Sequence, residues 1–202
     1  MLSLAQYESE IVFLTGVTSS NTVAAVSYYT YDGNIPPGYS TVAQAIKWGD
    51  PTPGTAGETV KYWFDPAAGW SNTEKGVWAG AFTQWAGLAN ISFSLADDAA
   101  SANVTLQRLA NKEAYANFNT SLTVPVGSDK VVKAPESGAI VTIDTTHNGY
   151  GPLNNNSNVV GGYPYSTVIH ELGHIIGLGH AGPYNGKVDG QQQQFKIGRA
   201  HV

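Results

Sequence analysis

The segment from His170 to His180 constrains this chain more than any other part of its sequence. It runs His-Glu-Leu-Gly-His-Ile-Ile-Gly-Leu-Gly-His and contains three of the five histidines in the 202-residue chain. On an α-helix, residues four apart lie one turn above the other on the same face. The imidazoles of His170 and His174 can therefore reach one metal ion, and the spacing predicts a helix that carries a metal site.

Three more residues of this segment complete the predicted site. Gly177 lies where a helix can end in a residue with positive φ, so that the chain turns back and brings His180 to the same ion. Three imidazoles and one water are typical of a catalytic zinc, whereas a structural zinc has four protein ligands. Glu171 lies about 100° around the helix from His170 and can act as a general base toward the metal-activated water. We therefore expect one catalytic Zn²⁺ held by His170, His174 and His180, with Glu171 as the catalytic residue.

The alternative is an amphipathic helix whose histidines only line a core. It would have to place three histidines, a glutamate and a glycine at these spacings by chance. Average residue usage predicts that coincidence in roughly one chain per hundred thousand of this length. The metal site is therefore the favoured interpretation. His147 is expected to be a solvated loop histidine, because a fourth ligand would close the catalytic position.

The complete spacing H-E-x-x-H-x-x-G-x-x-H resembles that of the metzincin zinc metallopeptidases. Residues 180–186, His-Ala-Gly-Pro-Tyr-Asn-Gly, are similar to the sequence after the third ligand in the serralysin branch, with Ala181 where that branch usually has proline. Residues 89–94, Ala-Asn-Ile-Ser-Phe-Ser, resemble a strand of the same branch. The resemblance implies a secreted bacterial zinc endopeptidase that acts on protein or peptide substrates.

The resemblance also implies features that this sequence lacks. Metzincins place a methionine-containing turn beneath the zinc ligands, downstream of the third histidine, but the single methionine here is Met1. Serralysin relatives usually carry a calcium-binding repeat domain behind the catalytic domain, so Ca²⁺ is expected mainly in a region absent here. The sequence therefore predicts a fragment that stops before the methionine turn.

Domain boundaries follow from these features and from the last residues. Residues 197–202, Ile-Gly-Arg-Ala-His-Val, can be encoded by the start of a widely used sequencing adapter. We therefore expect residues 196–202 to be a non-native tail and residues 40–195 to form a catalytic domain that is incomplete at its C-terminus. Residues 1–39, which include the break Pro-Pro-Gly at 36–38, are expected to be a separate N-terminal segment.

The hydrophobic pattern predicts an α+β fold. Residues 59–64, 91–95, 104–106 and 138–144 alternate as strands, and residues 40–48 are expected to form a short helix. Between Asn72 and Leu88, apolar residues recur at helical spacing, and Trp78, Phe82 and Trp85 are expected in the core. In a metzincin-like domain this gives a twisted mixed sheet with two main helices, the second of which carries the zinc motif.

The strand before the zinc helix is the predicted substrate site. In this architecture we expect it to form the edge of the sheet over the cleft, where an extended peptide could add by main-chain hydrogen bonds. The residues assigned to this role are Ala139, Ile140, Val141 and Thr142. The alternative is an ordinary edge strand screened by the loop at 146–164.

Composition excludes several other classes of function. The net charge is −5 and the lysines and arginines are scattered, so no surface for nucleic acid is expected. The absence of cysteine excludes disulfides and thiolate metal sites. The longest apolar run near the start, Ile11–Leu14, cannot span a membrane. The acidic residues Glu8 and Glu10 and the absence of a basic residue before Lys47 are not the pattern expected of a secretory signal. Extracellular localisation is thus implied by the family resemblance alone, and we expect a monomer.

Two other functions remain open at this point. The chain could be a zinc-binding but catalytically inactive fragment, which zinc content measured together with peptidase activity would reveal. It could also be a secreted glycan- or protein-binding domain that uses its Trp and Tyr side chains. That function predicts no stoichiometric zinc and no effect of His174→Ala.

Overall fold

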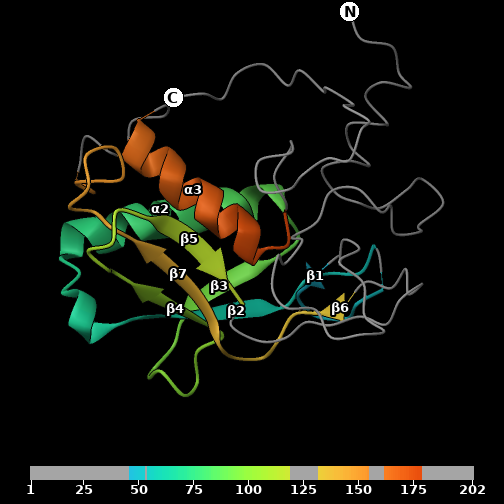
Figure 1. Ribbon diagram of the computed structural model, residues 1–202. Coiled ribbons are helices and arrows are strands. Elements are labelled where there is room, and N and C mark those ends of the chain that lie inside the picture. The colour runs from blue at the N-terminus through green and yellow to red at the C-terminus, as the bar shows by residue number, and fades with distance from the viewer. Residues whose placement is uncertain (1–45, 53, 119–131, 155–161, 179–202) are drawn as a thin grey trace, which may run out of the picture.

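The computed structural model describes residues 46–52, 54–118, 132–154 and 162–178. Within these residues the fold is α+β, with a mixed sheet and two α-helices, and it is compatible with a metzincin-like domain. The elements, drawn in Figure 1, are β1 (Ile46–Lys47), β2 (Thr59–Phe64), the 3-10 helix η1 (Pro66–Ala68), α2 (Asn72–Leu88), β3 (Ser92–Leu95), β4 (Val104–Gln107), β5 (Ala114–Asn117), β6 (Val132–Lys133), β7 (Ala139–Ile143) and α3 (Tyr163–Ile175).

Five of the described strands form the main sheet, in the order β3-β2-β4-β7-β5. The first four strands are parallel to their neighbours, and β5 runs antiparallel to β7. A second, parallel pair joins β1 to β6. The chain order and the spatial order of the strands differ, so the register of this sheet is set by long-range pairing.

Both helices lie on one side of the main sheet (Figure 1), where α2 contacts β3 and α3 contacts β5 and β7. The N-terminus of α2 is fixed by a capping box, in which Ser71 and Glu74 each accept from the other's backbone N–H. The ring of Phe82 stacks on Tyr62 of β2 at a centroid distance of 4.1 Å. The prediction that Trp78 and Phe82 belong to the core is confirmed, because both are buried.

Trp85 only partly fulfils the same prediction. Its side chain is half-buried and packs against the core from outside it. The indole Nε1–H donates to the backbone carbonyl of Ile169 at 3.0 Å. The benzene edge of the indole lies 3.3 Å from the position that a Cβ would occupy on Gly173. Trp85 therefore joins α2 to α3, and Gly173 leaves the space in which the two helices approach.

The predicted helix at residues 40–48 is wrong where the structure describes it. Ile46 and Lys47 form strand β1 and pair with β6, and residues 40–45 lie outside the described part of the chain. The indole of Trp48, which is 1% exposed, donates to the carbonyl of Ile175 at 2.7 Å. A long-range contact with the end of α3 and strand pairing thus outweigh the weak local preference for helix.

The expectation that residues 139–143 form the edge of the sheet is also wrong. Strand β7 pairs with β4 on one side and with β5 on the other, so it is an interior strand. The main chain of Ala139, Ile140, Val141 and Thr142 is therefore engaged by neighbouring strands and cannot bind a peptide by adding a strand. The edge strand on this side of the sheet, within the described residues, is β5.

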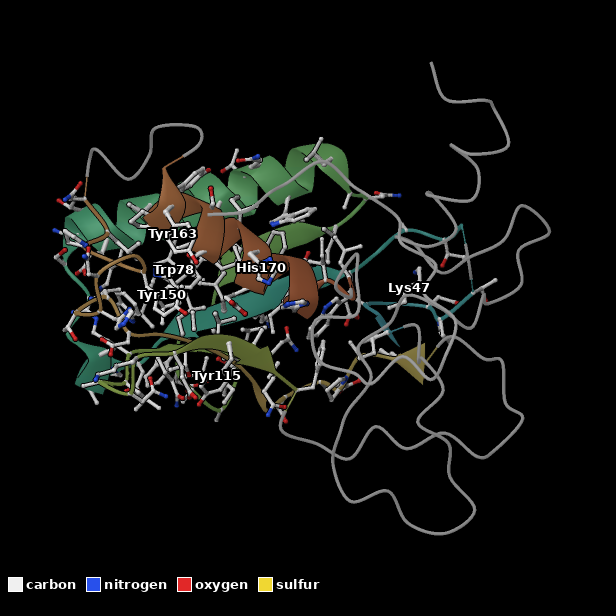
Figure 2. All side chains as sticks on the ribbon, turned by 45° about the horizontal axis from the view of Figure 1, so that its top comes forward. Lys47, Trp78, Tyr115, Tyr150, Tyr163 and His170 are labelled. Atoms are coloured by element: carbon white, nitrogen blue, oxygen red, sulfur yellow. The ribbon has the colours of Figure 1, made fainter. Side chains whose placement is uncertain are left out.

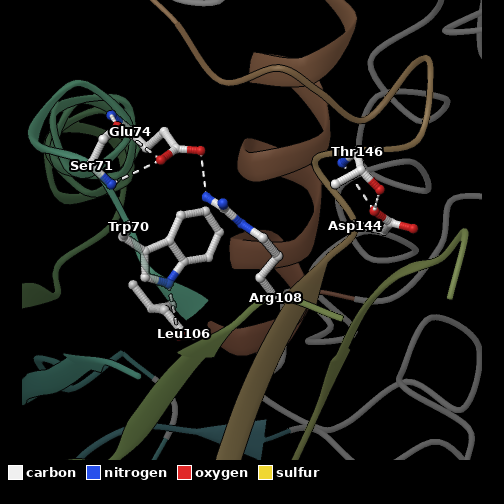
Figure 3. A network of polar contacts seen from close by, with 7 residues as sticks. All are labelled: Trp70, Ser71, Glu74, Leu106, Arg108, Asp144 and Thr146. Atoms are coloured by element: carbon white, nitrogen blue, oxygen red, sulfur yellow. Dashed lines mark hydrogen bonds and ion pairs between the residues drawn. The ribbon is translucent and has the colours of Figure 1, made fainter. Parts of the chain in front are cut away.

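A polar cluster fastens the start of α2 to the end of β4 (Figure 3). The guanidinium of Arg108 forms an ion pair with Glu74 and lies 4.2 Å from the ring centroid of Trp70. The Trp70 indole donates to the carbonyl of Leu106 at 3.1 Å.

A second group of polar contacts in Figure 3 lies after the end of β7. Thr146 donates through its hydroxyl and its backbone N–H to the carboxylate of Asp144. These hydrogen bonds hold the pKa of Asp144 below its usual range.

Replacing Arg108 by methionine is expected to lower the free energy of unfolding by about 1–3 kcal/mol, because it removes both the half-buried ion pair and the cation–π contact. Urea denaturation of the single variants R108M and E74Q and of the double variant checks this. The cycle should show a coupling between Arg108 and Glu74. Strictly additive losses would mean that the ion pair contributes nothing.

Candidate metal centre

Helix α3 presents the predicted zinc motif on a well-anchored element. It begins after Gly162 with a proline in its first turn, a position where proline fits a helix without cost. Val168, Leu172 and Ile175 are fully buried and pack its inner face toward the sheet. The metal-motif residues occupy the last two turns, and Figure 2 shows His170 on this helix. The predicted helix, and the placement of His170, Glu171 and His174 on it, agree with the structure.

The side chains of His170 and His174 converge. Their Nε2 atoms are 3.1 Å apart, and their rings meet edge to face at a centroid distance of 4.6 Å. Two Zn–N bonds of about 2.0–2.1 Å at a tetrahedral angle would place two ligand nitrogens about 3.3 Å apart. The observed separation therefore fits two ligands of one zinc ion.

The surroundings of His174 favour the form of the ring that binds a metal. Its Nδ1 lies 2.8 Å from the backbone carbonyl of Leu178, a contact that places the ring hydrogen on Nδ1 and leaves the lone pair on Nε2. Burial of the ring, which is 8% exposed, lowers the pKa of His174. A neutral imidazole that carries its lone pair on Nε2 is the form that coordinates zinc through this atom.

Glu171 is buried between α3 and β5. Its side chain is 5% exposed, and this burial raises the pKa of the carboxyl group to about 7. A hydrogen bond from the backbone N–H of Ala116, on β5, acts in the opposite direction because it stabilises the ionised form. Burial is the larger of the two effects, so the pKa of this carboxyl group lies above that of an exposed glutamate.

The C-terminus of α3 forms the turn that the sequence predicts at Gly177. This residue has φ +101°, a conformation that side-chain-bearing residues rarely adopt. A Cβ at this position would overlap the backbone carbonyl of Ile46 on β1. The turn is closed by backbone hydrogen bonds from Gly177 to His174 and from Leu178 to Gly173, both at 2.9 Å. Gly177 is therefore required by its φ angle and by the close approach of β1.

The third predicted ligand lies outside the described residues, which end at Leu178 in this region. Among the residues that the structure describes, no group of three or more His, Cys, Asp or Glu side chains is placed to hold a metal ion. The assignment of His180, and with it a complete three-histidine centre, therefore stays a prediction. The same is true of the tail at 196–202 and of the segment at 1–39.

His147 differs from its expected state as a solvated loop residue. It is half-buried, and its ring lies 5.1 Å from that of Tyr150, which in turn stacks near Tyr163 at the start of α3. Figure 2 shows Tyr150 and Tyr163 close together near the start of α3. His147 therefore helps to pack the loop after β7 against the helix.

Sequence reasoning missed two residues that shape this site. Ala116 belongs to a strand with the sequence Ala-Tyr-Ala-Asn, which lacks the apolar alternation of a recognisable strand. The sequence predicts a helix at Trp48, whereas its indole donates to the backbone at the end of α3. The only local signal for β5 was its aromatic residue Tyr115, and nothing local indicated that Trp48 lies beside Ile175.

Comparison with known proteins gives a partial match. No protein-family model matches the chain. A serralysin from Photorhabdus luminescens is 33% identical over 102 residues, which is 50% of this chain and 18% of that protein. This chain therefore spans a small part of the relative, and the similarity suggests at most a metzincin-like relationship and hints at a protease. In the described part of the chain, neither helix is long and apolar enough to cross a membrane.

Proposed function

We propose that this chain is the zinc-binding part of the catalytic domain of a metalloendopeptidase, with His170, His174 and His180 as ligands and Glu171 as the general base. The observation that carries the proposal is the convergence of two Nε2 atoms at 3.1 Å on the helix that also carries the buried carboxyl group of Glu171. The similarity to a serralysin supports the choice of a peptidase among zinc hydrolases.

Zinc and the residues of the site would have different roles in peptide hydrolysis. Zinc, when bound, would polarise the scissile carbonyl and acidify a water molecule. Leu178 holds the His174 ring in the orientation that presents Nε2. Glu171, whose pKa is raised to about 7, would accept a proton at its carboxylate and return it to the leaving amine. The burial of Glu171 restricts competing contact with bulk water.

The substrate would lie along β5. Strand β7, which the sequence suggested for this role, is interior, whereas β5 is the described edge strand and its Ala116 contacts Glu171. A peptide that brings its scissile bond to Glu171 must pass beside β5. An extended peptide running along an edge strand is a common mode of peptide recognition.

Secretion, and calcium binding mainly in a C-terminal region outside this chain, are further parts of this proposal. Both rest on the serralysin-like sequence at residues 180–186 and on the family it resembles, in which calcium would act mainly in a C-terminal repeat region. The expected monomeric state likewise remains a proposal.

The decisive experiment is removal and restoration of the metal. The purified chain is expected to contain one zinc per molecule by elemental analysis and to cleave a quenched fluorescent peptide library. Chelation with EDTA should abolish cleavage, and added Zn²⁺ should restore it, whereas Ca²⁺ added alone should not. Stoichiometric zinc without cleavage would favour the inactive zinc-binding module, and absence of zinc binding would contradict the proposal.

A further inference from the structure

One hydrogen bond at the start of β5 shows which of its N–H groups point toward β7 and which point away from it. The N–H of Asp144, which follows β7, donates to the carbonyl of Glu113 at 3.0 Å, so the N–H and C=O of Glu113 point toward the β7 side. In an antiparallel pair, successive residues alternately direct their peptide groups toward the partner strand and away from it. Counting from Glu113, the N–H of Tyr115 points toward β7 and the N–H of Ala116 points away from it.

This outward N–H meets the candidate general base. The backbone of Ala116 donates a hydrogen bond to the carboxyl group of Glu171, and the two residues are 6% and 5% exposed. Helix α3 packs against β5, which brings the two together. A buried carboxylate needs a donor, because losing hydration without one costs several kcal/mol. The N–H of Ala116, which the alternation along β5 directs away from β7, is therefore the same group that donates to Glu171.

We propose that the peptide N–H of Ala116 is a positioning group, which holds the Glu171 carboxylate between α3 and the edge of the sheet in the orientation needed for proton transfer. The proposal rests on the proposed function of Glu171 as the general base. A backbone donor suits this role because the pairing of β5 with β7 fixes its direction, whereas a side-chain donor would have rotamer freedom.

The experiment replaces one atom. Ala116 is changed to lactic acid in the full chain by suppression of a stop codon, which converts the amide to an ester and removes the N–H but keeps the methyl group. We expect kcat to fall about tenfold or more, because a well-placed general base contributes about 10²–10⁴-fold. KM should stay within about twofold and zinc affinity should not change, since neither depends on this hydrogen bond.

The matched control is the same ester at Leu95, made with leucic acid. Leu95 is at the end of β3, the opposite edge strand of the main sheet within the described residues. Its neighbour Ala96 donates to Tyr62 on β2, so the N–H of Leu95 points away from the sheet. This ester removes an outward N–H far from the site and should leave kcat unchanged.

A second measurement does not depend on activity. In the zinc-loaded chain, the amide proton of Ala116 should shift upfield in the NMR spectrum when Glu171 is replaced by alanine, which removes the acceptor, while that of Leu95 should not move. An unchanged Ala116 resonance, or full kcat in the lactate ester, would overturn the proposal. A wild-type chain that binds zinc but cleaves nothing contradicts the proposed function instead, and the amide shift then still decides whether Ala116 holds Glu171.

Discussion

Replacing Glu171 by glutamine is expected to reduce kcat for peptide cleavage by about 10²–10⁴-fold while the chain keeps its zinc. Glutamine has nearly the same shape as glutamate, and its amide oxygen can still accept from the N–H of Ala116. It cannot take up a proton near neutral pH. The histidine pair does not depend on this carboxyl group, because His174 is oriented by Leu178.

Zinc content and cleavage of the same fluorescent peptide should be measured together on this variant. The control is Glu136→Gln, which removes an exposed carboxylate that pairs with Lys133 away from α3. We expect the control to keep full activity, because an exposed ion pair contributes little to stability. Peptidase activity retained by Glu171→Gln would refute the assignment of the base.

The second large effect is expected at the turn after the zinc helix. Gly177→Ala should lower the free energy of unfolding by about 3 kcal/mol, because the alanine must adopt a φ angle of +101° and its Cβ must overlap the carbonyl of Ile46. The turn would have to open, which would separate α3 from β1. Zinc affinity should fall as well, since the turn holds the carbonyl of Leu178 against His174.

The matched control for this variant is Gly76→Ala. Gly76 lies within α2, and a Cβ there would meet nothing within 4 Å. Alanine is preferred over glycine in a helix by about 1 kcal/mol, so the same substitution should stabilise the chain. Urea denaturation of the two variants should therefore give midpoints that move in opposite directions. Equal midpoints would mean that the backbone at Gly177 has another conformation.

Much of the fold could be predicted from local patterns. The strands at 59–64 and 138–144 and the helix at 72–88 were predicted at the places where β2, β7 and α2 lie. These segments carry a strong hydrophobic period, since each buries one face against the other layer. The helix of the zinc motif was predicted for a different reason, because a helix places two histidines four residues apart on one face, where both can bind the same metal ion.

Other parts could not be predicted, because their structure depends on partners that are distant in the sequence. Strand β5 is short and rich in alanine, and it is a strand because β7 pairs with it. Because β5 is not recognisable in the sequence, the segment that forms β7 is expected to be an edge strand, and Ala139–Thr142 are expected to bind the substrate. Lys47 likewise joins a strand through its pairing with Lys133, although its local sequence suggested a helix.

The sequence by itself determined the residue types and spacing of the candidate site, namely two histidines one helical turn apart, a glutamate next to one of them in the chain and a glycine where the helix ends. Helical geometry translates these spacings directly into positions, so no tertiary information is needed. Only the tertiary structure decided which strand meets the site. The contact of Ala116 with Glu171 and the pairing of β7 on both sides arise from the order of strands in the sheet, which long-range hydrogen bonds and burial select and which no local pattern encodes.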